Sequence, residues 1–272
     1  MTIVVGADGS VVARAAVEWA ARRAERTGDE LALVTVVDDG WGTVGASVVA
    51  ELRARAEGLA EREFRAALAV APGVRVRGEV IVGSPVLRLA EASRDADLVV
   101  VGTHKVGYFH GRALGSRGLQ LAGVAAAPTA VVPVASARGR SGVAVGVSDG
   151  DDSDDAIRFA MDEAGSLGEH LVLVRASDGD ADDRALERAA DLIAASAPDL
   201  AVDARRPAGA AAESLIGLTR RSKLTVVGRR SARRGFLPLG RTNADVLMNL
   251  AGPVVVVPQV AVQSRLVGWS VA

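Results

Sequence analysis

The stretch VVGADGSVVARAAVEWA (4–20) lies without a gap over AVGVSDGDDSDDAIRFA (144–160) when the chain is shifted by 140 residues. Both stretches contain a short apolar run that ends in glycine, then a polar turn, then a segment with alanines at helical spacing. A strand, a turn and a helix are therefore expected twice, at equivalent places. The chain is interpreted as an internal duplication.

The correspondence continues along the chain, with shifts that fall from 140 to 126 and 125. It pairs LALVTVV (31–37) with LVLVRAS (171–177), LVVVG (98–102) with LTVVG (224–228), and APTAVVP (127–133) with GPVVVVP (252–258). Units of this length are too long for a solenoid repeat and are long enough to be domains. We predict two domains, residues 1–137 and 141–272, joined by the Ser/Gly/Arg-rich stretch ASARGRSG (135–142).

Short apolar runs alternate with helical segments inside each copy. In the first copy the helices are expected at 11–27 and 45–70, Gly28 suits a helix C-terminus, and Ser84-Pro85 suits a helix start. Strands are expected at 2–6, 31–37, 74–82, 97–101 and 129–134. Strands that are apolar throughout are typical of parallel sheets covered on both faces. The predicted fold class is α/β, with an open, doubly wound parallel sheet built twice.

Composition excludes several classes of protein. The chain has 272 residues, 49% hydrophobic and 24% charged, with a net charge of −1 and no cysteine. It therefore has no disulfide scaffold, thiolate zinc site or cysteine nucleophile. No apolar run approaches the roughly 18 residues of a membrane span, and MTIVVGADGS (1–10) lacks a basic leader region, so we expect a cytoplasmic protein. The near-neutral charge gives no reason to expect nucleic acid or an anionic membrane as partner.

Ligands of open α/β sheets bind outside the carboxyl ends of the strands. GADGS (6–10) follows the first expected strand, and GTHK (102–105) follows the fourth; nine further residues then precede Gly115-Ser116, which opens a helix. Glycine allows close backbone approach to a phosphate, and a helix N-terminus offers free N–H groups. The same pattern also builds ordinary turns, so at this point both interpretations stay open.

These motifs resemble the universal stress protein family, whose domains have VVGxDGS at the first strand, G-x2-G-x9-G(S/T) after the fourth, and a PVxVVP-like last strand. The resemblance covers nearly the whole chain, and the chain is similar to the tandem-domain members of the family. It implies five parallel strands per domain in the order 3-2-1-4-5, an ATP site between strands one and four, and a role in the stress response. It also implies that the two domains pair through edge strands, as separate subunits do; a homodimer of the whole chain stays open.

The resemblance places ATP, with or without Mg²⁺, against the first domain. Asp8 would contact the ribose or adenine, and Val36 would bond the adenine edge through its backbone. The other positions would line the base and ribose (Val101, Gly102) or hold the phosphates (Gly115, Ser116 and the N–H of Arg117).

Lys105 departs from the family motif, which has glycine there. If the backbone there needs glycine for a positive φ or a close approach, the lysine costs about 1 kcal/mol or more and crowds the phosphates; in the alternative, its ammonium donates to them. The neighbouring His104 is interpreted as an exposed loop residue rather than a general base. His104 and His110 make a poor metal pair because no third ligand stands near them.

The second copy lacks the expected site residues. Ser148 stands where the first copy has Asp8, Ala176 stands for Val36, and Arg241 replaces the motif serine. Aspartates crowd its first turn, where they suit a helix N-terminus better than a calcium loop (Asp149, Asp151, Asp152, Asp154, Asp155). Arginines follow its fourth strand, either as a solvated loop or as a site for an anion or acidic partner (Arg229, Arg230, Arg233, Arg234, Arg241).

The expected function is adenine-nucleotide binding by the first domain, with the second as a structural or regulatory partner and no dedicated enzyme activity. The first alternative is a scaffold of the same family that has lost nucleotide and works by pairing. The second is a slow ATPase or adenylyl-transfer enzyme of the same superfamily. The turns ADGS (7–10) and VSDGDDS (147–153) match neither of the signatures that such enzymes carry, SGGxDS or HxGH.

Overall fold

The first repeated stretch forms β1 (Thr2–Gly6) and α1 (Val11–Thr27) in the computed structural model. Ser10 is the N-cap of α1, and its Oγ accepts the Ala13 N–H at 3.2 Å. The helix ends at Gly28, whose φ of 72° is left-handed, as the sequence predicts. The structure describes residues 1–38, 46–104, 117–148, 153–176, 184–229 and 239–259.

Five strands and four helices alternate in the described part of each half. The N-terminal half continues with β2 (Glu30–Val37), α2 (Ala46–Val70), β3 (Arg75–Val82), α3 (Pro85–Ala92), β4 (Leu98–Thr103), α4 (Arg117–Val124) and β5 (Thr129–Pro133). The C-terminal half contains β6 (Val143–Gly146), α5 (Asp154–Leu167), β7 (Leu171–Val174), α6 (Arg184–Ser196), β8 (Val202–Arg205), α7 (Ala211–Thr219), β9 (Leu224–Arg229), α8 (Arg241–Asn249) and β10 (Val254–Pro258). Pro85 opens α3 as expected, although the Ser84 hydroxyl makes no capping bond.

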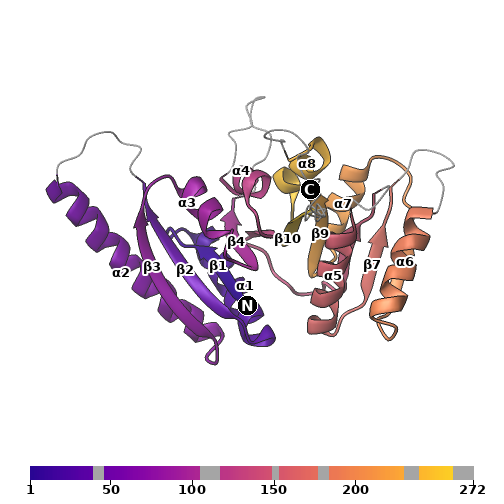
Figure 1. Ribbon diagram of the computed structural model, residues 1–272, viewed down its shortest axis with the longest axis horizontal. Coiled ribbons are helices and arrows are strands. Elements are labelled where there is room, and N and C mark those ends of the chain that lie inside the picture. Colours follow the sequence, from indigo (N-terminus) through magenta and orange to yellow (C-terminus); the bar gives the residue numbers. More distant parts are fainter. Residues whose placement is uncertain (39–45, 105–116, 149–152, 177–183, 230–238, 260–272) are drawn as a thin grey trace, which may run out of the picture.

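All ten strands belong to one sheet, in the order β3-β2-β1-β4-β5-β10-β9-β6-β7-β8. The predicted α/β class and the 3-2-1-4-5 order are confirmed in both halves. Pairing is parallel everywhere except between β5 and β10, which run antiparallel and join the halves. The two predicted sheets are therefore continuous across this seam, and Figure 1 shows the halves side by side, indigo to magenta and orange to yellow.

An apolar core covers each face of the sheet and crosses the seam. Alanines of α1 and α5, among them Ala20 and Ala160, are fully buried on one face, together with residues of α2 and α6. Leu89 of α3, Leu121 of α4 and Leu215 of α7 lie in the core of the other face, with residues of α8. None of the helices in the described ranges is long and apolar enough to cross a membrane.

Candidate functional site

The carboxyl ends of β1, β2 and β4 enclose a cleft of about 120 Å³ in the N-terminal half. Leu89 of α3 and Leu121 of α4 form part of its apolar wall. Five of the eight residues expected at the nucleotide site line it: Asp8, Val36, Val101, Gly102 and Arg117. The parallel register brings them together, because the strands that carry or precede them end at one edge of the sheet.

Asp8 lies in the turn between β1 and α1. Its Oδ1 accepts the Ser10 N–H at 3.0 Å, and the side chain is exposed at the cleft. Gly9 next to it has a φ of +76°, a conformation that favours glycine. The turn therefore holds a carboxylate where it can accept hydrogen bonds from hydroxyl or amino groups of a ligand.

Gly102 is required by packing inside the protein. A Cβ built on Gly102 would overlap the Val12 carbonyl and lie 2.7 Å from the Ala13 nitrogen, both at the start of α1. The sequence interpretation considers this glycine only as a ligand contact that lines the base and ribose, and this packing is a second reason for glycine at the position. Glycine at this position lets α1 begin directly against the end of β4.

Arg117, the first residue of α4, reaches across to the end of β2. Its Nη2 lies 3.1 Å from Oδ2 of Asp38, and both side chains are exposed. Sequence reasoning missed Asp38, although it directly follows a strand at the carboxyl edge and could have been found by that signal. The Arg117 guanidinium is thus already partnered in this structure.

Three of the expected site residues, Lys105, Gly115 and Ser116, lie outside the described residues, as does His110. His104 is exposed, which agrees with its interpretation as a loop residue. The described part of the chain holds no group of three or more His, Asp or Glu side chains placed to bind a metal ion.

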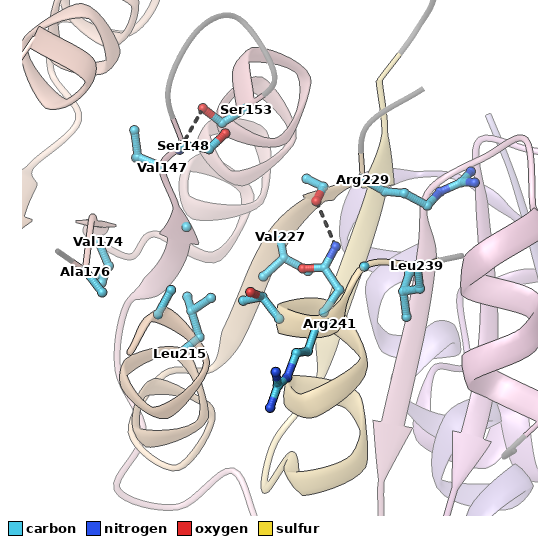
Figure 2. Close-up of a pocket in the computed structure, with 16 residues that line it drawn as sticks. Val147, Ser148, Ser153, Val174, Ala176, Leu215, Val227, Arg229, Leu239 and Arg241 are labelled. Atoms are coloured by element: carbon cyan, nitrogen blue, oxygen red, sulfur yellow. Dashed lines mark hydrogen bonds between the residues drawn. The ribbon is translucent and has the colours of Figure 1, made fainter. Parts of the chain in front are cut away.

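The C-terminal half has a larger cleft of about 560 Å³ at its equivalent edge (Figure 2). Ser148, Ala176 and Arg241, the substituted positions found in the sequence, all line it. The Ser148 N–H donates to Ser153 Oγ at 3.4 Å, and Asn243 Nδ2 donates to the Gly228 carbonyl at 2.9 Å. The cleft has serine where the other half presents Asp8, and its volume lies within the roughly 300–1,000 Å³ that is usual for ligand pockets.

Arg229 turns away from this cleft toward the N-terminal half (Figure 2). Its Nη1 and Nη2 donate to the carbonyls of Gly123 and Ala125, at the C-terminal end of α4, at 2.6 and 2.5 Å. Burial lowers the pKa of this guanidinium below its ordinary value. Arg229 is therefore a tie between the halves, neither a solvated loop residue nor an anion ligand. Arg241 remains exposed, and the other arginines of the expected basic loop, Arg230, Arg233 and Arg234, lie outside the described residues.

Acidic residues open α5, as the sequence predicts. Asp154 and Asp155 stand in its first turn, where they complement the helix dipole. The remaining aspartates of the run, Asp149, Asp151 and Asp152, fall outside the described residues.

The comparison with family models concerns the N-terminal half of the chain. Residues 1–133 match the model of the universal stress protein family. A universal stress protein of Mycobacterium tuberculosis is 34% identical over 192 residues, 62% of this chain and 61% of that relative. A second one from the same organism is 34% identical over 138 residues, 48% of this chain and 47% of its own length. The chain thus matches less than two thirds of the length of these relatives.

The whole fold also has a counterpart among solved structures. A universal stress protein from Archaeoglobus fulgidus superposes with a TM-score of 0.80 over 94% of this chain and 98% of that chain, at 17% identity. The similarity extends over both halves and concerns the fold.

Proposed function

We propose that the N-terminal half, whose residues 1–133 match the model of the universal stress protein family, binds an adenine nucleotide, with ATP as the expected ligand. One observation carries the proposal: Asp8, Val36, Val101, Gly102 and Arg117 line a single cleft at the carboxyl edge of the sheet. Each is a position that the family resemblance assigns to the nucleotide. The proposed role is nucleotide-responsive regulation in the stress response.

The chemistry of the cleft suits the three parts of the ligand. Its apolar wall accepts a base, the Asp8 carboxylate accepts ribose hydroxyls, and the start of α4 supplies N–H groups for a phosphate. The cleft of about 120 Å³ is smaller than usual ligand pockets. In our proposal the Arg117 guanidinium leaves Asp38 and turns toward the phosphates when a triphosphate binds. We propose binding without dedicated catalysis, because the turn ADGS (7–10) at this cleft matches neither SGGxDS nor HxGH, the signatures that catalytic members of the superfamily carry.

A second candidate is a scaffold that works by domain pairing alone. The continuous sheet favours it, because β5 and β10 join the halves without any ligand. In this case the N-terminal cleft stays unfilled in the working protein, and the larger C-terminal cleft is free for a different ligand.

Matched substitutions at equivalent positions separate these candidates. ATP is titrated calorimetrically into the full chain, into Asp8→Ala and into Ser148→Ala, which changes the same position of the other half. Loss of a charge-assisted hydrogen bond of about 1.5–3 kcal/mol predicts a roughly 10- to 150-fold weaker affinity for Asp8→Ala and no change for Ser148→Ala. The reverse pattern would move the site to the C-terminal half. No heat with the unsubstituted chain would favour the scaffold.

A further inference from the structure

The seam between the halves has a local two-fold axis. Under the shift of 125 that aligns the two last strands, Ala130 corresponds to Val255, and these two residues pair with each other across the seam. The flanking pairs, Val131 with Val254 and Thr129 with Val256, exchange under the same shift. The axis therefore passes through the Ala130–Val255 pair, and each half presents equivalent positions to the other, as in a symmetric dimer.

The same axis brings residues of α1 against their own counterparts in α5. Under the shift of 140, Arg23 corresponds to Glu163 and Arg26 to Ser166. Arg23 Nε donates to Glu163 Oε1 at 2.6 Å, and Arg26 Nε donates to Ser166 Oγ at 3.2 Å. In a dimer of two identical halves, each of these positions would face the same position of the partner. Here it faces the equivalent position of the other half, which carries a different residue.

The charge pair at the axis is buried. The Glu163 side chain is 2% exposed and that of Arg23 13% exposed, and Arg26 adds a second contact to Glu163 at 3.4 Å. Two copies of the N-terminal half in this arrangement would place arginine against arginine, and two copies of the C-terminal half would place glutamate against glutamate. Like charges that face each other out of water repel, and two Glu163 carboxylates would also lose both arginine partners, so both homotypic pairs are disfavoured.

The surroundings of the pair reinforce this asymmetry. Asp29 Oδ2 lies 3.2 Å from Arg23 Nη1, beside its bonds to Glu163. The counterpart of Asp29 is Glu169, which is engaged elsewhere: it accepts the Gly142 N–H at 2.7 Å and pairs with Lys223 at 2.5 Å. Asp29 therefore stabilises the arginine at the axis, whereas its counterpart Glu169 binds the backbone at the start of β6, next to the linker.

We propose that Arg23 and Glu163 select the pairing partner: the α1 face of the N-terminal half accepts the α5 face of a C-terminal half and rejects a second α1 face. The partner is the other half of the same chain. The inference does not depend on nucleotide binding.

Single charge reversals in the full chain reproduce the disfavoured pairs. Glu163→Arg places two arginines at the axis, and Arg23→Glu places two glutamates there. Exposed neighbours on the same helices provide matched controls, Asp162→Arg on α5 and Arg22→Glu on α1. We expect both axis variants to lower the thermal midpoint by roughly 5–15 °C relative to their controls. Axis variants as stable as their controls would overturn the proposal.

Combining the reversals tests the pairing rule itself. The double variant R23E/E163R restores opposite charges at the axis, although its new carboxylate at position 23 would face Asp29 and its new guanidinium at position 163 would face Arg26. We expect it to recover part of the lost midpoint, and a midpoint at or below that of the less stable single variant would overturn the proposal. Mixing tagged Glu163→Arg chains with Arg23→Glu chains should also give heteromers, since only the mixture offers opposite pairs between chains. Capture no greater than between two Glu163→Arg chains would contradict partner selection.

Discussion

Arg229, the last residue of β9, donates to the Gly123 carbonyl of α4 at 2.6 Å, so a side chain of the C-terminal half holds a helix of the N-terminal half by its C-terminal end. A cation at this end complements the helix dipole. The opposite end of α4 starts with Arg117 at the candidate nucleotide cleft. The two halves are thus connected through α4 as well as through the sheet.

Arg229→Met should lower the free energy of unfolding by about 2–3 kcal/mol, because two carbonyls lose a charged donor. Chemical denaturation of the full chain measures this change. Arg241→Met is the control, since Arg241 is 96% exposed and should be neutral within about 0.5 kcal/mol. Equal effects of the two substitutions would show that the tie to α4 contributes nothing.

Gly102→Ala should destabilise the chain by about 1–3 kcal/mol and distort the start of α1, since the new methyl group would overlap the Val12 carbonyl. Gly123→Ala, where a Cβ would meet nothing within 4 Å, should be neutral or slightly stabilising within α4. Thermal unfolding compares the two. A Gly102→Ala protein with unchanged stability would disprove the close approach of β4 to α1.

Glu63→Gln should lower the free energy of unfolding, and the size of this loss should be the same at low and at high salt concentration. Glu63 is 1% exposed and accepts two bonds from Arg14, at 2.6 and 2.8 Å, which tie α2 to α1. The exposed Glu61–Arg65 pair of the same helix is the control, and Glu61→Gln should change the free energy of unfolding by under about 1 kcal/mol. Both variants are unfolded in low salt and in about 0.5 M NaCl. A Glu63→Gln effect that vanishes in high salt would argue against a buried pair.

Glu169→Gln should lower stability at neutral pH more than in acid. The hydrogen bond from Lys223, and next the Gly142 N–H, lower the pKa of Glu169 from its ordinary value of 4.5. A depressed folded pKa means that the stabilisation is present above the unfolded value and is lost as pH falls through the folded one. The midpoint gap between Glu169→Gln and the parent should therefore be largest near neutral pH and shrink below about pH 4. A gap that widens in acid would reverse the assigned sign.

Asp38→Asn should strengthen nucleotide binding if the N-terminal cleft is the site. Removing the carboxylate releases Arg117 for the phosphates, and an exposed ion pair worth up to about 1 kcal/mol predicts an affinity gain of up to about fivefold. Calorimetric titration of ATP measures it. A loss of affinity as large as that expected for Asp8→Ala would instead indicate that Asp38 contacts the ligand directly.

The fold was predictable because its signals are local and repeated. The glycine at position 28 ends α1 as expected, and the apolar runs became strands within a few residues of their predicted bounds. The joining of the halves was implied only by the family resemblance. Antiparallel pairing of β5 with β10 depends on contacts between residues more than 120 positions apart, which periodicity does not encode.

The site was predictable only in outline. Asp8 and Val101 reach one cleft because parallel strands end together, which follows from the fold class. The partners of the arginines did not follow, since a guanidinium can reach many carbonyls and carboxylates. Arg229 therefore looked like a loop cation in the sequence, whereas in the structure it binds α4. The relative sizes of the two clefts also depend on packing that residue identities alone do not determine.

The joining of β5 to β10 leaves only β3 and β8 as borders of the described sheet. The residues of β8 are exposed and so are most of those of β3, and both strands carry charges, among them Arg75 and Glu79 on β3 and Asp203 on β8. Apolar edge strands favour edge-to-edge pairing with strands of other molecules, and charged side chains on an edge strand disfavour such pairing. Pairing of β5 with β10 buries two valine-rich strand edges, the kind of edge that promotes aggregation between molecules when it is exposed.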